Sequence, residues 1–200
     1  GPIEVAGVNA GKVGFFSYYQ HRLDIHHLKV EEIAGMPLEV FSEFGEPSPS
    51  VGLTNFDPGT KVVATVPSPV LDTPGYRRKV TGWTGTGSAP KSGIWFLPGN
   101  PRVNFVINKA SSLTWNWKSE VKVNIEAEGG GKVSGASTKW YKMGTKLSAT
   151  ALPSSGHMFD GWYGSMSTKS KNLTFYANQP ADLTAVFRPD SDKDGMADDW

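Results

Sequence analysis

The sequence predicts an all-β protein made of two tandem copies of one small module. Glycine and proline contribute 23 and 14 of the 200 residues, and their spread along the chain divides it into short segments. Many of these segments alternate apolar and polar residues, which is the period of a half-buried strand. Cysteine is absent, which excludes disulfides, cysteine-ligated metals and thiol catalysis.

The charge balance and the hydropathy pattern restrict the partners. Twenty Lys and Arg residues oppose 19 Asp and Glu residues, for a formal net charge of +1. A general nucleic-acid binder normally carries a basic excess, so we expect no nucleic-acid partner. No apolar stretch approaches the roughly 18 to 20 residues that cross a bilayer, so we expect no membrane insertion. If the protein is exported, we expect its signal outside these residues.

The N-terminal segment, residues 1–37, differs from the rest of the chain. Its apolar residues follow neither a clear strand period nor a clear helix period. We interpret it as the end of a preceding domain, or as a strand that either completes the first module or is exchanged with a neighbouring subunit.

Residues 38–119 are expected to form the first module. Leu38 and Val40 alternate with polar neighbours, and a turn at residues 57–59 leads into an apolar strand. Near the end of this range, Trp115 and Trp117 share one strand face.

Residues 120–188 are expected to form the second module, because they repeat three landmarks of the first in the same order. Each landmark consists of a short stretch in the first module and its echo in the second: residues 59–66 and 144–151, residues 82–83 and 161–162, and residues 111–117 and 181–187.

The second module carries Gly144-Thr145, an Ala-Leu-Pro segment at 151–153, a Phe-Asp-Gly-Trp corner at 159–162 and a Leu-Thr-Ala-Val-Phe strand at 183–187. These motifs resemble the divergent form of the bacterial internalin B-type repeat, over roughly residues 38–188. The first module departs from the pattern at its corner and at its last strand. The resemblance implies that each copy is a small β-sandwich or β-grasp-like module, of the kind repeated as stalk or adhesion domains in large exported bacterial proteins. Such modules are also attached to secreted polysaccharide-degrading enzymes.

Residues 189–200 form an acidic segment that resembles a thrombospondin type 3 or EF-hand-like calcium loop. Calcium takes six to eight oxygen ligands, and residues at loop positions 1, 3, 5, 7 and 9 supply them. The alternative is a solvated acidic linker. The predicted ligands are the carboxylates of Asp190, Asp192 and Asp194, the backbone carbonyl of Met196, and Asp198 directly or through water.

Two long loops of the first module contain the candidate ligand-binding residues Trp95, Tyr76, Arg77 and Arg78. An exposed aromatic ring could stack on a sugar ring. The alternative for Trp95 is packing against the core or between the modules.

No catalytic motif is present, so we expect no enzyme activity and no catalytic residue. We interpret the chain as a structural or adhesion module of an exported bacterial cell-surface or extracellular protein. It would act as a stalk or assembly unit, with other protein modules or copies of itself as partners. One alternative is a carbohydrate-binding module with a glycan as partner. Another is a subunit of an extracellular filament joined by strand addition.

Overall fold

The computed structural model describes residues 35–198, and all the regular structure in this range is β-strand. The predicted all-β class is confirmed. The described part contains no helix long and apolar enough to cross a membrane. The interpretations of the N-terminal segment concern residues that lie almost entirely outside this range.

The described strands are β1 (Met36–Phe41), β2 (Gly52–Phe56), β3 (Thr60–Thr65), β4 (Val70–Leu71), β5 (Tyr76–Thr86), β6 (Ser92–Ile94), β7 (Arg102–Ile107), β8 (Ser111–Glu128), β9 (Gly131–Gly135), β10 (Lys139–Lys142), β11 (Lys146–Pro153), β12 (His157–Gly164), β13 (Asn172–Tyr176) and β14 (Ala181–Pro189).

The first half of this range (residues 35–117) packs two sheets around one core. In the larger sheet β1 lies between β2 and β8, and β8 also pairs with β5. The strands β3 and β7 form the smaller sheet. Alternation along the strands turns the apolar residues inward. The first core contains Leu38, Val40, Val62, Ala64, Val66, Val80, Ala89, Val103, Ile107, Leu113 and Trp115.

The second half (residues 121–190) repeats this arrangement around a separate core. Its strands β12, β14, β8 and β10 belong to the same nine-stranded sheet as β1, β2 and β5, and β9, β11 and β13 form a separate three-stranded sheet. The second core contains Val121, Val123, Leu147, Ala149, Ala151, Phe159, Trp162, Leu173, Phe175, Ala177, Ala181, Leu183, Ala185 and Phe187.

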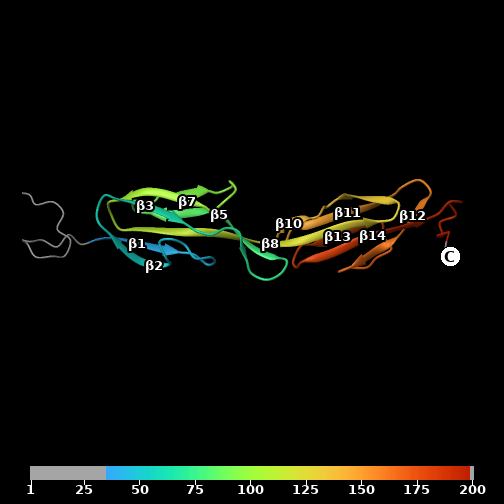
Figure 1. Ribbon diagram of the computed structural model, residues 1–200, viewed down its shortest axis with the longest axis horizontal. Coiled ribbons are helices and arrows are strands. Elements are labelled where there is room, and N and C mark those ends of the chain that lie inside the picture. The colour runs from blue at the N-terminus through green and yellow to red at the C-terminus, as the bar shows by residue number, and fades with distance from the viewer. Residues whose placement is uncertain (1–34, 199–200) are drawn as a thin grey trace, which may run out of the picture. The chain divides into compact units, whose positions relative to one another are not determined.

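The long strand β8 belongs to both halves (Figure 1). Its N-terminal part contributes Leu113 and Trp115 to the first core, and its C-terminal part contributes Val121 and Val123 to the second. The expected module boundary after residue 119 falls inside this strand. No glycine or proline interrupts β8, so nothing in the local sequence ends the extended conformation.

The two halves share their strand connectivity. In the first half the first strand, β1, runs parallel to the last, β8. In the second half the first strand, β8, runs parallel to the last, β14. In each half the last strand also pairs with an antiparallel strand that carries a bulge before a Gly-Trp pair. The bulges lie between Val80 and Gly82 and between Phe159 and Gly161.

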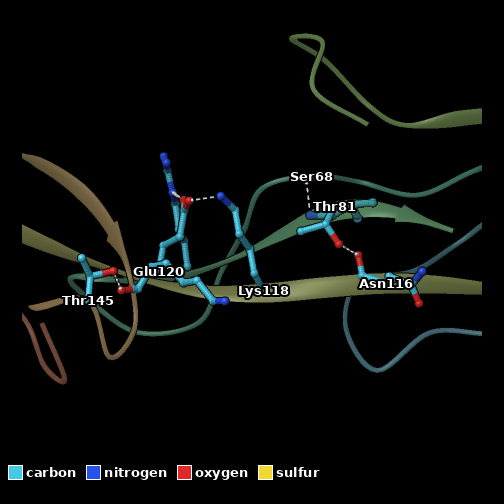
Figure 2. Close-up of polar contacts among 9 residues, drawn as sticks. Ser68, Thr81, Asn116, Lys118, Glu120 and Thr145 are labelled. Atoms are coloured by element: carbon cyan, nitrogen blue, oxygen red, sulfur yellow. Dashed lines mark hydrogen bonds and ion pairs between the residues drawn. The ribbon is translucent and has the colours of Figure 1, made fainter. Parts of the chain in front are cut away.

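The residues at the two bulges differ. Thr81 donates a hydrogen bond from Oγ1 to the Asn116 carbonyl at 3.1 Å (Figure 2). Asp160 accepts hydrogen bonds from the Tyr163 hydroxyl at 2.8 Å and from Lys169 Nζ at 3.0 Å. These bonds lower the pKa of Asp160, with Tyr163 as the largest cause. The same backbone feature therefore carries different surface chemistry in the two halves.

A Gly-Thr turn recurs with nearly the same geometry. Gly59 and Gly144 both adopt φ = 84°, a left-handed conformation that favours glycine. The next residue closes each turn, because the Oγ1 atoms of Thr60 and Thr145 each donate at 2.6 Å to the carbonyl three residues earlier. The backbone nitrogens of these threonines donate to the same carbonyls, each at 3.1 Å.

Candidate functional site

The junction between the two halves is organised around Glu120, a buried residue of β8 with 6% of its surface exposed. Arg77 lies opposite it on β5 and donates from Nε to Glu120 Oε2 at 2.7 Å. Lys118 Nζ lies 2.7 Å from Glu120 Oε1. Figure 2 shows the Lys118 side chain rising from β8 toward the Glu120 carboxylate. Both oxygens of this carboxylate are therefore paired with cations.

The electrostatics of the junction favour ionised Glu120. Burial by itself raises the pKa of the Glu120 carboxyl, but hydrogen bonds and charge attraction from Lys118 and Arg77 outweigh burial, so the pKa lies below its ordinary value. The Arg77 guanidinium also stacks on Trp140, 4.4 Å from the ring centroid. Because Trp140 belongs to β10, Arg77 connects a strand of the first half to a strand of the second.

The segment before Arg77 also contacts the second half. Tyr76 is half-buried and packs against the second core. The Gly75 carbonyl accepts a hydrogen bond from the Lys122 backbone at 2.9 Å. A Cβ atom at Gly75 would lie 2.5 Å from Pro180 Cγ, so only glycine fits this contact without a shift.

Arg78 has partners on three sides within the protein. It forms an ion pair with Asp72 at 3.0 Å, a hydrogen bond with Ser119 and a cation–π contact with Phe44, whose ring centroid lies 4.7 Å away. Tyr76, Arg77 and Arg78, which the sequence offered as ligand contacts, thus meet other parts of the chain. Ligand binding by these three residues stays a prediction.

Trp95 follows β6 and is half-buried against the first core. Its indole Nε1 is buried and has no hydrogen-bond partner among the described residues. This position agrees with the alternative of packing against the core. A glycan contact at Trp95 stays a prediction.

The acidic segment brings three of its predicted ligands together. One carboxylate oxygen from each of Asp190, Asp192 and Asp194 lies within 4.8 Å of the other two. Asp192 and Asp194 are exposed, but Asp190 has only 7% of its surface exposed. Its Oδ1 atom is buried and has no hydrogen-bond partner in the described residues. An ionised carboxylate at such a position is costly unless it is paired.

The other two predicted ligands hold the loop together. Asp198 accepts hydrogen bonds from the Ser191 hydroxyl at 2.6 Å and from the Ser191 backbone at 2.8 Å, and these bonds lower the pKa of Asp198. The Met196 backbone nitrogen donates to Asp194 Oδ1 at 2.8 Å. Among the described acidic residues of the segment, Asp198 is therefore outside the three-carboxylate cluster.

Sequence reasoning did not identify Glu120, Lys118 or Trp140 as a site. They look like ordinary members of alternating strands, and their role depends on Arg77, which lies 43 positions before Glu120 in the sequence. The repeat itself contained a signal, because counting three residues beyond Trp117 and beyond Phe187 reaches Glu120 and Asp190.

Comparison with protein families matches residues 121–191 to the Divergent InlB B-repeat domain. The predicted resemblance is confirmed for this range, which begins within β8 and includes Asp190. This repeat family is typical of bacterial surface or extracellular proteins. Comparisons with curated proteins and with solved structures give no significant match.

Proposed function

We propose that the chain is a non-enzymatic spacer of a large exported bacterial surface or extracellular protein. In this proposal residues 36–119 are a divergent copy of the repeat matched at residues 121–191. The two copies share a strand, so the spacer holds whatever is attached at its ends at a fixed separation. The continuity of β8 through both cores is the observation that carries the proposal.

The shared connectivity supports the assignment of two copies. Both halves have a first strand parallel to the last, a bulge before Gly-Trp and a Gly-Thr turn with matching hydrogen bonds. Unrelated sandwiches have no reason to repeat all three features in one order.

The contacts at the junction support rigidity. A flexible linker would be rich in glycine or serine and would lack tertiary contacts. Here the junction is a paired strand, the Glu120 carboxylate bonds Arg77 from β5, and Tyr76 packs against the second core. Bending the junction would break these contacts.

Electron paramagnetic resonance between two spin labels tests the rigidity. The chain has no cysteine, so Lys61→Cys and Lys146→Cys introduce unique labelling sites at equivalent exposed positions of β3 and β11. We expect a narrow distance distribution. Inserting Gly-Gly between Ser119 and Glu120 should broaden it, although an insertion of two residues preserves the alternation of side chains.

A Gly-Gly insertion at the exposed turn next to Gly99 is the matched control and should leave the distribution narrow. A distribution that is already broad without the insertion would show that the two halves move independently, and a distribution that stays narrow after the junction insertion would show that β8 and its contacts do not set the separation. Either result would contradict the spacer.

We also propose that the acidic segment binds Ca²⁺. The buried, unpartnered Asp190 Oδ1 supports this second function, together with the cluster that Asp192 and Asp194 complete. Oxygen-only ligands suit calcium, whereas zinc prefers nitrogen and sulfur. Calorimetric titration should detect one Ca²⁺ site that the exposed double variant Asp192→Asn, Asp194→Asn lacks. Equal binding by this variant would contradict the proposal.

A further inference from the structure

Each half ends on a buried acidic residue at the same structural position. Val80 pairs with Trp117 at the first bulge, and Phe159 pairs with Phe187 at the second. Glu120 lies three residues beyond Trp117, and Asp190 lies three residues beyond Phe187. Among the described residues, these are the two buried charged side chains, with 6% and 7% of their surfaces exposed.

The residues opposite the two acids are also equivalent. Three residues before Val80 lies Arg77, which pairs with Glu120. Three residues before Phe159 lies Gly156, whose carbonyl accepts a hydrogen bond from the Asp190 backbone at 2.9 Å. Gly156 is in a left-handed turn with φ = 73°, so β12 begins one residue later. At the position where the first half has the guanidinium of Arg77, the second half has a glycine, Gly156, and therefore no side chain.

The counter-charges therefore differ. Both oxygens of Glu120 are paired with cationic side chains. Asp190 has an orphaned buried oxygen, and the nearby carboxylates of Asp192 and Asp194 add negative charge. Three carboxylates in one place repel one another unless a cation lies among them. Two oxygens bound to one Ca²⁺ can be up to about 5 Å apart, because each bond is about 2.5 Å long, and the cluster is within this limit.

We infer that a Ca²⁺ ion at Asp190, Asp192 and Asp194 is the counter-charge that closes the second half, in the place that Arg77 occupies in the first. The inference rests on the two proposals that the halves are copies and that the acidic segment binds Ca²⁺. At the internal junction the cation is a built-in side chain, so the closure is permanent. At the C-terminal end the closure depends on the metal, so calcium controls the stability of the edge formed by β12 and β14.

Matched neutralisations of the two acids test this inference. Thermal unfolding of the whole chain is followed in EDTA and in 10 mM CaCl₂. This calcium concentration is on the order of ten times the dissociation constant of the weaker extracellular calcium sites. We expect calcium to raise the Tm of the wild type by about 5 °C. Asp190→Asn should lose this rise and should match or exceed the wild-type Tm in EDTA, because it removes an unpaired buried charge.

Glu120→Gln should lower the Tm in both solutions and retain the calcium rise, since its partners lose their shared anion. Glu128→Gln, at an exposed residue of β8, controls for loss of a negative charge and should behave as the wild type. Asp192→Asn with Asp194→Asn removes calcium ligands without altering the buried residue, and should match the wild-type Tm in EDTA.

Three results would overturn the inference. Asp190→Asn could lower the Tm in EDTA as much as Glu120→Gln, which would mean that Asp190 already has a counter-charge in the protein. Calcium could bind by calorimetry without changing the wild-type Tm. These two results leave the calcium proposal standing, whereas a failure of calcium to bind in calorimetry contradicts that proposal as well. None of the three results depends on the spin-label distances, so failure here is distinguishable from failure of the spacer.

Discussion

The carboxylates of Glu120 and Asp190 lie at equivalent ends of the two halves but have opposite surroundings. Glu120 is held between Arg77 and Lys118, whereas Asp190 faces Gly156 and two further carboxylates. The comparison teaches that one fold can keep a buried acid at its exit strand while the groups around that acid change. In the first half the compensating cations are side chains that are always present, whereas the proposed Ca²⁺ ion would make the closure of the second half depend on the solution.

Reversing the charge of the two buried acids should give the largest difference in stability between the two halves. Glu120→Lys puts a third cation beside Arg77 and Lys118, and it should lower the free energy of unfolding by about 3 kcal/mol or more. Asp190→Lys places an ammonium group near Asp192 and Asp194, so in EDTA it should remain within about 1 kcal/mol of the wild type. Urea unfolding measures both. Similar losses of unfolding free energy in the two variants would show that the surroundings of the two acids are not opposite.

Removal of the guanidinium tests the junction from the opposite side. Arg77→Ala leaves Glu120 with Lys118 alone and removes the stacking on Trp140, so we expect a loss of about 2 kcal/mol in urea unfolding. Part of the ion-pair energy is screened, because 22% of the Arg77 side chain is exposed. Arg77→Lys should recover part of the loss. An Arg77→Ala variant as stable as the wild type would show that strand pairing alone stabilises the junction.

The pH dependence of the unfolding free energy should reflect the ionisation of Glu120. Its pKa is lowered in the folded protein, so its ionisation stabilises the fold above the unfolded value of about 4.3. That contribution is lost as the pH falls through the folded pKa. The difference in unfolding free energy between the wild type and Glu120→Gln should therefore shrink below about pH 4. A difference that is constant with pH would show that the carboxylate charge is not the stabilising feature.

The smallest expected effect concerns the turns that the halves share. Thr60→Val and Thr145→Val each remove one hydroxyl bond of 2.6 Å, and each should cost about 0.5 kcal/mol in urea unfolding. Equal losses would sharpen the view that these turns are copies. A loss confined to one half would contradict their equivalence.

Much of the fold follows from local patterns. The alternation around Leu38 and around Val121 predicts strands whose buried faces the structure confirms, because a strand shows its period within a few residues. The Gly-Trp corners and the Gly-Thr turns are recognisable for the same reason. The family resemblance of the second half depends on these short motifs.

The junction could not be predicted from local patterns. Residues 111–117 and 121–128 look like two strands, and only pairing with β5 and β14 places them in one. The sequence predicts that Tyr76 and Arg77 lie in a long loop, which is typical of ligand contacts. The structure instead places them in β5, where they contact the neighbouring half. The acidic spacing predicted the candidate metal ligands, whereas the burial of Asp190 depends on its place at the end of β14.

Hydrogen exchange of the intact chain, measured peptide by peptide in CaCl₂ and in EDTA, tests the central claim most directly. If calcium supplies the counter-charge of Asp190, exchange should slow by about tenfold or more in β12, β14 and residues 189–198. Exchange in β3 and β7, whose half is closed by Arg77 and Lys118, should not change. Equal protection of both halves, or no protection at β12 and β14, would contradict the account.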